Sequence, residues 1–521
     1  MKATQRRSSS SRLRTFGQSE PQIALDSLQG NIVPGFSKDH QWFLYYGLVD
    51  PQAGRRSLSE LAHHVSSAAE VLAFNRLYRA LRRRRGSEPG GLAATWVNLA
   101  FSFPGLTALL PANQLVGFRD EAFKIGLPTR SALIGDPPTT KEWVIGGPGN
   151  IPDLVVIVAA DREEDASDTA REVDGLLAGW KQLHVDRGRV RPDLSGHEHF
   201  GFKDGISQPG MRGLASSQAR DYITPRVLAS SDQDAQLYAA PGQPLVWPGQ
   251  FIFGYPTQDT VDPMAAGPVA DQVPYWGRNG SYMVVRRLRQ DVSAFNSFVK
   301  DLSGKCGLPA DLVGAKLVGR WQSGAPVMRA TSHDIPQLGS DRVAANDFAF
   351  AAAGMKHRYR RGIKVGDFPL SLADLNGNVC PHAAHIRKVN ARDEGTDLGG
   401  LAKSMSMRIL RRGVPFGPPF DPADQNSANV ERGLIFVSYQ TSIEEQFEQL
   451  TIDWVNSAIL PKGGGFDPVI GQNGAGARGR TFEIVPGTSI SITTEWVRST
   501  GGGYFFAPPI DALSTTLGPT A

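Results

Sequence analysis

The sequence predicts an α+β protein of two ferredoxin-like domains. In the first half, strand-like runs at 42–49, 96–103 and 153–160 alternate with helical segments at 57–85 and 166–180. This alternation within about 160 residues is typical of a ferredoxin-like sheet that carries its helices on one face. A doubly wound sheet is disfavoured, because no Gly-x-Gly-x-x-Gly motif opens a helix after a strand and there is no P-loop lysine.

Each element of the first half has its own signal. Residues 42–49, 96–103 and 153–160 are short apolar runs, as expected of buried strands. Residues 57–85 have helical periodicity and end in four arginines, whose charge suits the C-terminal end of a helix dipole. We interpret the arginine run as a solvated helix end rather than as a nucleic-acid patch. Residues 166–180 show the amphipathic pattern of a second helix.

The second half repeats this order of elements. Strands are expected at 281–286, 407–410, 433–439 and 489–494, and helices at 292–302 and 443–460. The shared order indicates two related domains, although the two halves show no literal sequence repeat.

The domain bounds follow from this pattern and from composition. A polar segment rich in Ser, Gln and Ala separates the two halves and is interpreted as a linker or long loop. The expected bounds are a disordered arm at 1–20, an N-terminal domain at 21–212, the linker at 213–248, a C-terminal domain at 249–505 and a tail at 506–521. Further surface loops are expected at 339–368 and 463–479.

Composition describes an ordinary globular protein. The 55 basic and 51 acidic residues give a net charge of +4, which is too balanced to indicate a nucleic-acid or membrane partner. No apolar run approaches the length of a membrane span. The basic, serine-rich segment 1–20 has no apolar stretch after it, which argues against a secretory signal and predicts a cytoplasmic protein. Two cysteines, Cys306 and Cys380, are too few for the disulfide framework of a secreted protein.

The strongest chemical signal surrounds His385. This histidine follows two alanines and precedes three cations, Arg387, Lys388 and Arg392. A neutral imidazole with small neighbours can approach a flat metal macrocycle, and nearby cations can pair with the carboxylates of that macrocycle. The alternative is a core histidine that is hydrogen-bonded to a carbonyl group, and this segment alone leaves both interpretations open.

An acid between glycines forms the second signal. Asp204 lies between Gly201 and Gly205, and glycines allow a planar ligand to approach the backbone closely. A carboxylate placed there could move a proton between the two oxygens of a peroxide. The plainer interpretation is a turn aspartate that bonds to its own backbone.

The third signal combines an arginine pair with an apolar strand face. A fixed guanidinium in a dry pocket stabilises negative charge on a departing oxygen, whereas a surface arginine only forms an ion pair. Strand alternation directs either Arg411 or Arg412 inward, but does not say which. Leu434 and Phe436 share one face of the strand at 433–439, where they serve as ordinary core, as the wall of a dry pocket, or as both.

A zinc site is a rival interpretation. His382 could share a helical face with His385 and combine with His197 or His199. The spacing of a helical zinc protease and a clear third set of ligands are missing, so a zinc hydrolase is kept only as an alternative.

Together, these segments resemble the dye-decolorizing peroxidase family. Residues 201–205 are similar to the family's Gly-x-x-Asp-Gly motif and are followed by Ile-Ser-Gln-Pro, as the family often has it. His385, in Ala-His-Ile-Arg-Lys, is similar to the proximal histidine. Arg411, four residues before Pro415, is similar to the distal arginine, and Arg392, seven residues after the histidine, to the propionate-pairing arginine.

Two weaker matches extend this resemblance. Leu434 and Phe436 resemble the distal apolar residues of the family, and residues 28–32 (Leu-Gln-Gly-Asn-Ile) resemble its opening segment. The resemblance therefore spans about residues 25–500. The chain resembles the larger subclass of the family, whose extra loops match the insertions noted above.

The resemblance implies a haem peroxidase. It implies haem b held mainly by the second domain, with His385 on the iron and Asp204 and Arg411 as catalytic residues. It implies further cofactor contacts from Gly205, Ile206, Ser207, Asn390, Ala391, Arg392, Leu434 and Phe436. The family also places an acid on the far nitrogen of the ligand histidine, and Glu444 or Glu445 is the candidate for that position.

The expected activity is the oxidation of dyes, phenols and other aromatic reductants by hydrogen peroxide in single-electron steps. A haem carrier or haem-iron release protein on the same fold is the first alternative, and the distal acid and arginine argue against plain carriage. A homo-oligomer is compatible with the sequence, and neither nucleic acid nor a membrane is expected as a partner.

Overall fold

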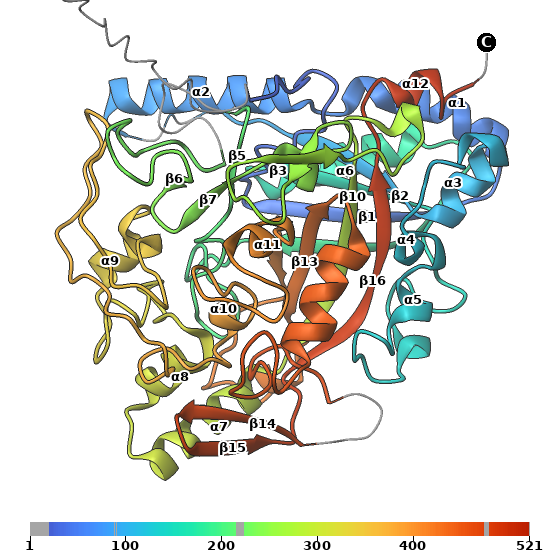
Figure 1. The fold of residues 1–521 in the computed structure, drawn as a ribbon. Coiled ribbons are helices and arrows are strands. Elements are labelled where there is room, and N and C mark those ends of the chain that lie inside the picture. The colour runs from blue at the N-terminus through green and yellow to red at the C-terminus, as the bar shows by residue number, and fades with distance from the viewer. Residues whose placement is uncertain (1–19, 88, 90, 215–222, 474–478, 520–521) are drawn as a thin grey trace, which may run out of the picture.

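The computed structural model describes residues 20–87, 89, 91–214, 223–473 and 479–519, so all but the last residue of the expected arm lies outside the described residues. Its centre is a nine-stranded sheet in the order β10-β16-β2-β3-β1-β4-β12-β13-β11 (Figure 1). A further pairing between β10 and β13 closes this sheet into a barrel. The predicted α+β class of two ferredoxin-like halves is confirmed by the strand order in each half.

The first half supplies four strands of the barrel. They are β1 (His40–Leu48), β2 (Trp96–Phe101), β3 (Leu154–Ala160) and β4 (Trp180–Arg189). They pair in the order β4-β1-β3-β2, so the first strand lies between the fourth and the third. The helices α1 (Pro51–Leu61), α2 (Ala68–Arg85) and α6 (Glu163–Leu176) connect these strands, as a ferredoxin-like half requires.

The second half repeats that arrangement. Its strands are β10 (Ser281–Gln290), β11 (Leu410–Arg411), β12 (Val414–Phe416), β13 (Gly433–Gln440) and β16 (Val497–Ala507). β10 lies between β16 and β13, while β11 and β12 follow one another along the free edge of β13. Numbered along the chain, the strands of each half therefore pair in the order fourth, first, third, second, which is β16, β10, β13 and then β11 with β12 in the second half.

Two narrow seams join the halves. At one seam β16 pairs with β2 through Phe506 and Phe101, and at the other β12 pairs with β4 through Phe416 and Gly188. The side chains around the seams are buried, so apolar packing supplements the few ladder hydrogen bonds.

The strands β1, β2 and β3 are buried on both faces, which explains their nearly continuous apolar sequence, whereas β4 is polar and partly exposed. In β3, Val156 and Val158 pack in the core beneath α1 and α6. The alternate residues Val155 and Ile157 pack in a second core with Met283 of β10.

The remaining elements lie outside the barrel or at its ends. The helices are α3 (Phe103–Leu109), α4 (Glu121–Ile125), α5 (Leu127–Arg130), α7 (Val292–Cys306), α8 (Ala310–Val318), α9 (Pro336–Ser340), α10 (His385–Lys388), α11 (Leu401–Ser406) and α12 (Ala512–Thr515). The short strands are β5 (Gly210–Met211), β6 (Tyr238–Ala240), β7 (Gln243–Val246), β8 (Pro256–Gln258), β9 (Ala266–Val269), β14 (Arg480–Val485) and β15 (Thr488–Ile492). No helix within the described part of the chain is long and apolar enough to cross a membrane.

Five elements differ from the sequence prediction. The sequence pattern does not predict β4, whose first residue, Trp180, falls in the helix expected at 166–180; that helix, α6, ends at Leu176. The strand expected at 407–410 shares only Leu410 with β11. The helical pattern at 57–85 divides at Ser67, whose side chain and Glu70 form a capping box at the start of α2. The helix expected at 443–460 consists of two π-helical segments, Ile443–Glu448 and Leu450–Val455. The strand expected at 489–494 is β15, which pairs only with β14, and the fourth barrel strand is β16.

The expected domain bounds stay predictions. The segment 213–248 contains the short strands β6 and β7, which form a three-stranded sheet with β5. The segment 506–521 begins with the last two residues of β16 and contains α12.

Candidate functional site

A cavity of about 310 Å³ gathers most of the residues that the sequence singled out. His385, Asp204 and Arg411 all line it, although they come from three distant parts of the chain. Leu434 and Phe436 of β13 line it as well. The fold therefore places an imidazole, a carboxylate and a guanidinium around one space.

His385 is held by a buried carboxylate. Its Nδ1 lies 2.8 Å from Oδ2 of Asp467, whose side chain is 0% exposed. The other carboxylate oxygen accepts the backbone N–H groups of Val469 and Ile470 at 2.8 and 3.0 Å. Because Nδ1 is engaged, Nε2 is the nitrogen of His385 that is available to a ligand in the cavity.

Charge pairing outweighs burial at this histidine. Burial acts to lower the pKa of His385, but the charge of Asp467 and its hydrogen bond raise the pKa above the ordinary value. Burial acts to raise the pKa of Asp467, but the partner histidine and the two backbone N–H donors lower it. Asp467 is thus kept as an anion that increases the basicity of the imidazole.

The expected acid partner, Glu444 or Glu445, is corrected by this geometry. Glu444 accepts the backbone N–H of Glu121 and lies 3.5 Å from Arg130, on the first half of the barrel. Glu445 follows it in the first π-helical segment, and its backbone N–H donates to Ser442. The carboxylate that meets His385 belongs to Asp467.

Asp204 and Arg411 face each other at the cavity wall. Nη1 of Arg411 lies 3.5 Å from Oδ1 of Asp204, and Nη2 donates to the carbonyl oxygen of Ser207 at 2.9 Å. Oδ1 of Asp204 also accepts the backbone N–H of Gly205 at 2.6 Å, so the residue is both a turn aspartate and a cavity residue. Their side chains are 40% and 34% exposed, which leaves both groups accessible to a small solute.

The structure decides which arginine of the pair faces the cavity. Arg411 lines it, whereas Arg412 donates to the carbonyl oxygens of Asn31 and Ile32. Burial lowers the pKa of Arg412 to about 10. Arg412 therefore anchors the N-terminal segment of the described chain to β13.

A second cavity adjoins the first. Asp204, Gly205, Gln208, Arg411 and Leu434 line both cavities. The acid and the guanidinium thus stand between the main cavity and a second, more polar space that is open to solvent.

One end of the main cavity is strongly cationic. Nη1 of Arg392 donates to the carbonyl oxygens of Asn346 and Phe348 at 3.0 and 2.8 Å, and its guanidinium stacks on the ring of Phe348 at 3.6 Å. Arg320 and Arg408 line the same cavity. Nothing in the local sequence of these two arginines distinguishes them from surface cations, so they are not predictable from sequence as cavity residues.

Burial weakens the protonation of all three arginines. It lowers the pKa of Arg320 to about 9, with the charges of Arg392 and Arg411 adding to the effect. It lowers the pKa of Arg392 and of Arg408 to about 10. Nε of Arg408 is buried without a hydrogen-bond partner among the described residues. This end of the cavity therefore favours an anionic ligand.

The remaining expected contacts are mostly in place. Gly205, Ile206, Ser207 and Asn390 line the cavity. Ala391 does not line it and is buried at 3% exposure behind the wall. A direct contact from Ala391 is therefore not supported by the cavity shape.

The histidines of the zinc alternative do not meet. The ring nitrogens of His382 face the carbonyl oxygens of Gly463 and Leu375 at 3.0 and 3.2 Å. His199 faces the carbonyl oxygen of Phe416, and His197 faces those of Ser195 and Gln322. Within the described ranges these histidines form no group of three ligand atoms.

Known proteins are similar to this chain over nearly its whole length. Residues 27–192 match the model of the DyP dimeric alpha+beta barrel domain, and residues 358–458 match the C-terminal model of Dyp-type peroxidases. A dye-decolorizing peroxidase of Mycetinis scorodonius is 31% identical over 95% of this chain and 88% of its own length. The multifunctional dye peroxidase of an Amycolatopsis strain is 27% identical over 95% of this chain and 96% of its own.

Solved structures agree with these matches. An ancestral D-type dye decolorizing peroxidase superposes with a TM-score of 0.75 at 30% identity, covering 96% of this chain and all of the other. A fungal DyP-type peroxidase from Auricularia auricula-judae gives a TM-score of 0.72 at 30% identity, over 95% and 99% of the two chains.

The closed α+β barrel and the residues gathered around its cavity define a class, the barrel-type peroxidases. The chain belongs to the dye-decolorizing peroxidase family and is similar to its larger, fungal members. The expectation of a dye-decolorizing peroxidase is thereby confirmed, and the zinc hydrolase alternative is wrong.

The family implies haem, and the cavity fits it. No described residue engages Nε2 of His385, the strand face of Leu434 and Phe436 supplies an apolar wall, and the arginines of the cationic end match the carboxylates of haem in charge. Among the described residues, no acidic side chain forms an ion pair with Arg320, Arg392 or Arg408. Two propionates at that end would compensate the charges of these guanidinium groups.

Proposed function

We propose that this chain binds haem b through His385 and uses it to reduce hydrogen peroxide with electrons from dyes, phenols and other aromatic reductants. The observation that supports this most directly is the cavity itself. It combines the buried His385–Asp467 pair with the Asp204–Arg411 pair, and the family relation supports the same function.

Each residue has a distinct role in this proposal. Haem, when bound, supplies an iron that exchanges electrons with peroxide and with the reductant. Asp204 accepts the proton of one peroxide oxygen and returns it to the other. Arg411 stabilises the negative charge on the departing oxygen, which leaves as water when the O–O bond has broken. Leu434 and Phe436 form an apolar wall beside the Asp204–Arg411 pair, which shields part of the guanidinium from bulk water.

Two measurements test the function. The purified protein is expected to show a Soret band and, with hydrogen peroxide, to bleach an anthraquinone or azo dye. A Soret band without peroxide-dependent bleaching would indicate a haem carrier. Absence of the band after loading with haem would reject the haem proposal as a whole.

Replacing Arg392 with leucine is expected to weaken haem retention without unfolding the protein. A charge-assisted contact of this kind contributes about 1.5–3 kcal/mol, so the haem dissociation rate should rise roughly 10- to 150-fold. Haem transfer to excess apomyoglobin measures this rate. Arg432→Leu is the matched control, because Arg432 is also buried, donates to carbonyl groups and lies over an aromatic ring, but does not line the cavity. Equal rates in the two variants would contradict the role of Arg392.

Replacing Asp467 with asparagine should lower the affinity for haem and raise its reduction potential. The amide keeps the shape of the carboxylate but removes the charge that raises the pKa of His385. Removing the hydrogen-bond partner of a metal-binding histidine typically lowers the affinity for the metal about 10–100-fold. Spectroelectrochemical titration and haem titration measure the two effects. Glu445→Gln is the control and should behave like the parent; an effect there but not in Asp467→Asn would restore the sequence-based candidate.

A cytoplasmic location and a homo-oligomer are further proposals. The location is supported only by the composition of the first 20 residues. An oligomer is compatible with the barrel domain of the family, and light scattering on the purified protein would measure its size.

A further inference from the structure

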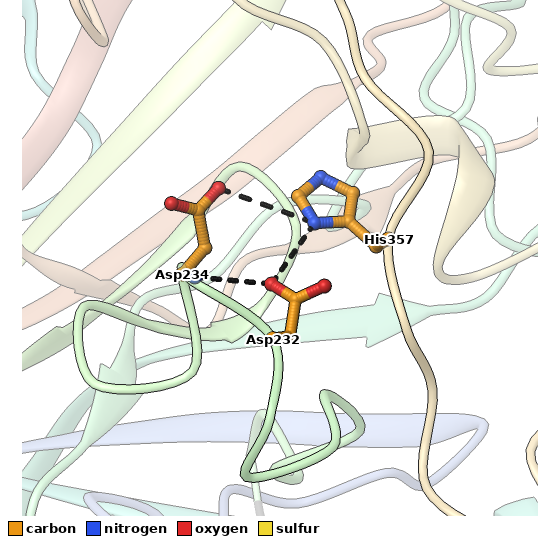
Figure 2. Close-up of side chains that lie close together, drawn as sticks. All are labelled: Asp232, Asp234 and His357. Atoms are coloured by element: carbon orange, nitrogen blue, oxygen red, sulfur yellow. Dashed lines mark hydrogen bonds and ion pairs between the residues drawn. The ribbon is translucent and has the colours of Figure 1, made fainter.

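A second group of polar side chains lies away from the haem cavity. Asp232 and Asp234 come from the loop before β6, and His357 comes from the long irregular segment between α9 and α10. Figure 2 shows the three side chains turned toward one another. None of them lines the main cavity, and the proposed peroxidase function uses none of them.

The backbone holds the two segments together. Leu228 and Tyr359 form a β-bridge, and the backbone N–H of Ala229 donates to the carbonyl oxygen of Arg358 at 2.8 Å. Oδ2 of Asp232 accepts the backbone N–H of Arg358 at 2.6 Å. The loop that carries the aspartates is therefore fixed against the segment that carries His357.

The three side chains have the spacing of ligands around one ion. Nδ1 of His357 lies 3.3 Å from Oδ1 of Asp232 and 4.0 Å from Oδ2 of Asp234, and the three ligand atoms all lie within 4.8 Å of one another. Metal bonds of about 2.0–2.2 Å place two ligand atoms about 3–4 Å apart. The His357–Asp232 pair also lies within hydrogen-bonding distance, and Oδ1 of Asp232 accepts the backbone N–H of Asp234 at 3.0 Å (Figure 2).

A fourth side chain orients the imidazole. Nε2 of His357 lies 3.4 Å from Oδ1 of Asp347, and the histidine side chain is 6% exposed. A carboxylate on the outer nitrogen favours the tautomer whose other nitrogen carries a lone pair, as is usual for metal-binding histidines. Nδ1 then faces the two carboxylates, where either a proton on this nitrogen or a bound cation compensates their negative charge.

Asp234 supplies an independent observation. Its carboxylate has no hydrogen-bond donor among the described residues, and its nearest charged partner is Nδ1 of His357 at 4.0 Å. The side chain is 28% exposed, so it can reach a ligand from the solvent side. Of the three carboxylates, only that of Asp347 has an arginine partner, Arg329 at 3.4 Å.

We propose that Asp232, Asp234 and His357 bind a divalent first-row transition-metal ion, with Asp347 as the residue that positions the imidazole. One nitrogen and two or more carboxylate oxygens suit such an ion better than Mg²⁺ or Ca²⁺, which prefer oxygen alone. Water completes the coordination on the exposed side, next to Asp234.

The ion would strengthen a part of the structure that the haem cavity depends on. It joins the loop of Asp232 to the segment of His357. Asp347 extends this connection to its chain neighbours Asn346 and Phe348, whose carbonyl oxygens hold Arg392. Metal binding is therefore expected to raise thermal stability.

Calorimetric titration with ZnCl₂ tests the proposal on the haem-loaded protein after dialysis against a chelator. The parent is expected to bind one Zn²⁺ per chain and to melt at a higher temperature with Zn²⁺ than without it. Asp234→Asn should weaken binding at least tenfold. The matched control is Asp367→Asn, because Asp367 is 94% exposed in the same segment as His357 and should leave binding unchanged.

An anomalous difference map from crystals grown with Zn²⁺ provides a test that needs no variant. The expected peak lies beside Nδ1 of His357. Three outcomes would overturn the proposal: no binding by the parent, unchanged affinity in Asp234→Asn, or a peak only at surface histidines such as His333. The first outcome, together with stability that responds to pH and not to Zn²⁺, would assign the cluster to a protonated imidazole instead.

Discussion

Replacing His385 with alanine is expected to remove most of the haem from the purified protein. The change removes the only imidazole that the described residues contribute to the cavity wall, and it leaves Asp467 buried without its partner. Removing only the hydrogen-bond partner of a metal-binding histidine lowers the metal affinity about 10–100-fold. Removing the histidine itself should therefore lower the haem affinity more than about 100-fold. The pyridine haemochrome assay gives haem per chain, and circular dichroism checks that the barrel remains folded.

His382→Ala is the control for this variant. His382 lies three residues earlier, faces two carbonyl groups and does not line the cavity. It should retain a full complement of haem. Full loading of His385→Ala, or selective loss in His382→Ala, would show that another histidine binds the iron.

Replacing Asp204 with asparagine is expected to slow the reaction with hydrogen peroxide by about 10²–10⁴-fold, the usual worth of general acid–base catalysis. The amide can still accept the N–H of Gly205, so the turn should persist. Stopped-flow measurement over a range of pH gives the rate. The parent rate should fall on acidification, because a protonated carboxyl group cannot accept a proton, and this acid limb should vanish in the variant.

Arg411→Leu provides the comparison for that result. It should slow the same reaction by about 10²–10³-fold, the worth of one lost donor to developing negative charge, and keep the acid limb. Arg411→Lys should recover part of the rate, because it restores the charge but not the planar donor geometry. If the acid limb survives in Asp204→Asn and vanishes in Arg411→Leu, Asp204 is only a turn residue and the assigned roles are wrong.

The parts of the site that are predictable from sequence are those with a local signature. His385 follows two small residues, Asp204 stands between glycines, and Leu434 and Phe436 alternate on one strand. Each signature reflects a local requirement, and the structure brings all four residues to one cavity. Their roles toward haem stay predictions.

Asp467 has no such signature. It is separated from His385 by 82 positions, and its contact arises only when the chain after the π-helical segments returns to α10. Proximity to the strand at 433–439 favours Glu444 and Glu445 instead, but Glu444 pairs with Arg130 and Glu445 is exposed. Arg320 and Arg408 were missed for the same reason, because burial creates their significance and burial depends on the tertiary fold.

The fold, like the site, has parts that local sequence patterns predict and parts that they do not. The apolar strands of the first half are apparent from composition, whereas β16 was missed because Gly501, Gly502 and Gly503 interrupt its apolar pattern. Glycine is normally unfavourable within a strand, but a Cβ at Gly502 would lie 2.1 Å from the carbonyl oxygen of Val285 in β10. Close backbone approach between the paired strands β10 and β16, which sequence periodicity does not reveal, explains Gly502.

The barrel closes within a single chain, and this leaves little strand edge for another molecule to join. Every described main-sheet strand except β11 has a neighbouring strand on each side, although at the two seams the pairing is confined to one residue of each strand. At β11, the side chain of Gln208 occupies the backbone N–H and carbonyl groups of Arg411 at 3.3 and 2.9 Å. Unpaired strand edges are the usual starting points of edge-to-edge aggregation. The central sheet is thus protected from such growth, and contacts between copies of the chain must use its helices, its loops or the small outer sheets.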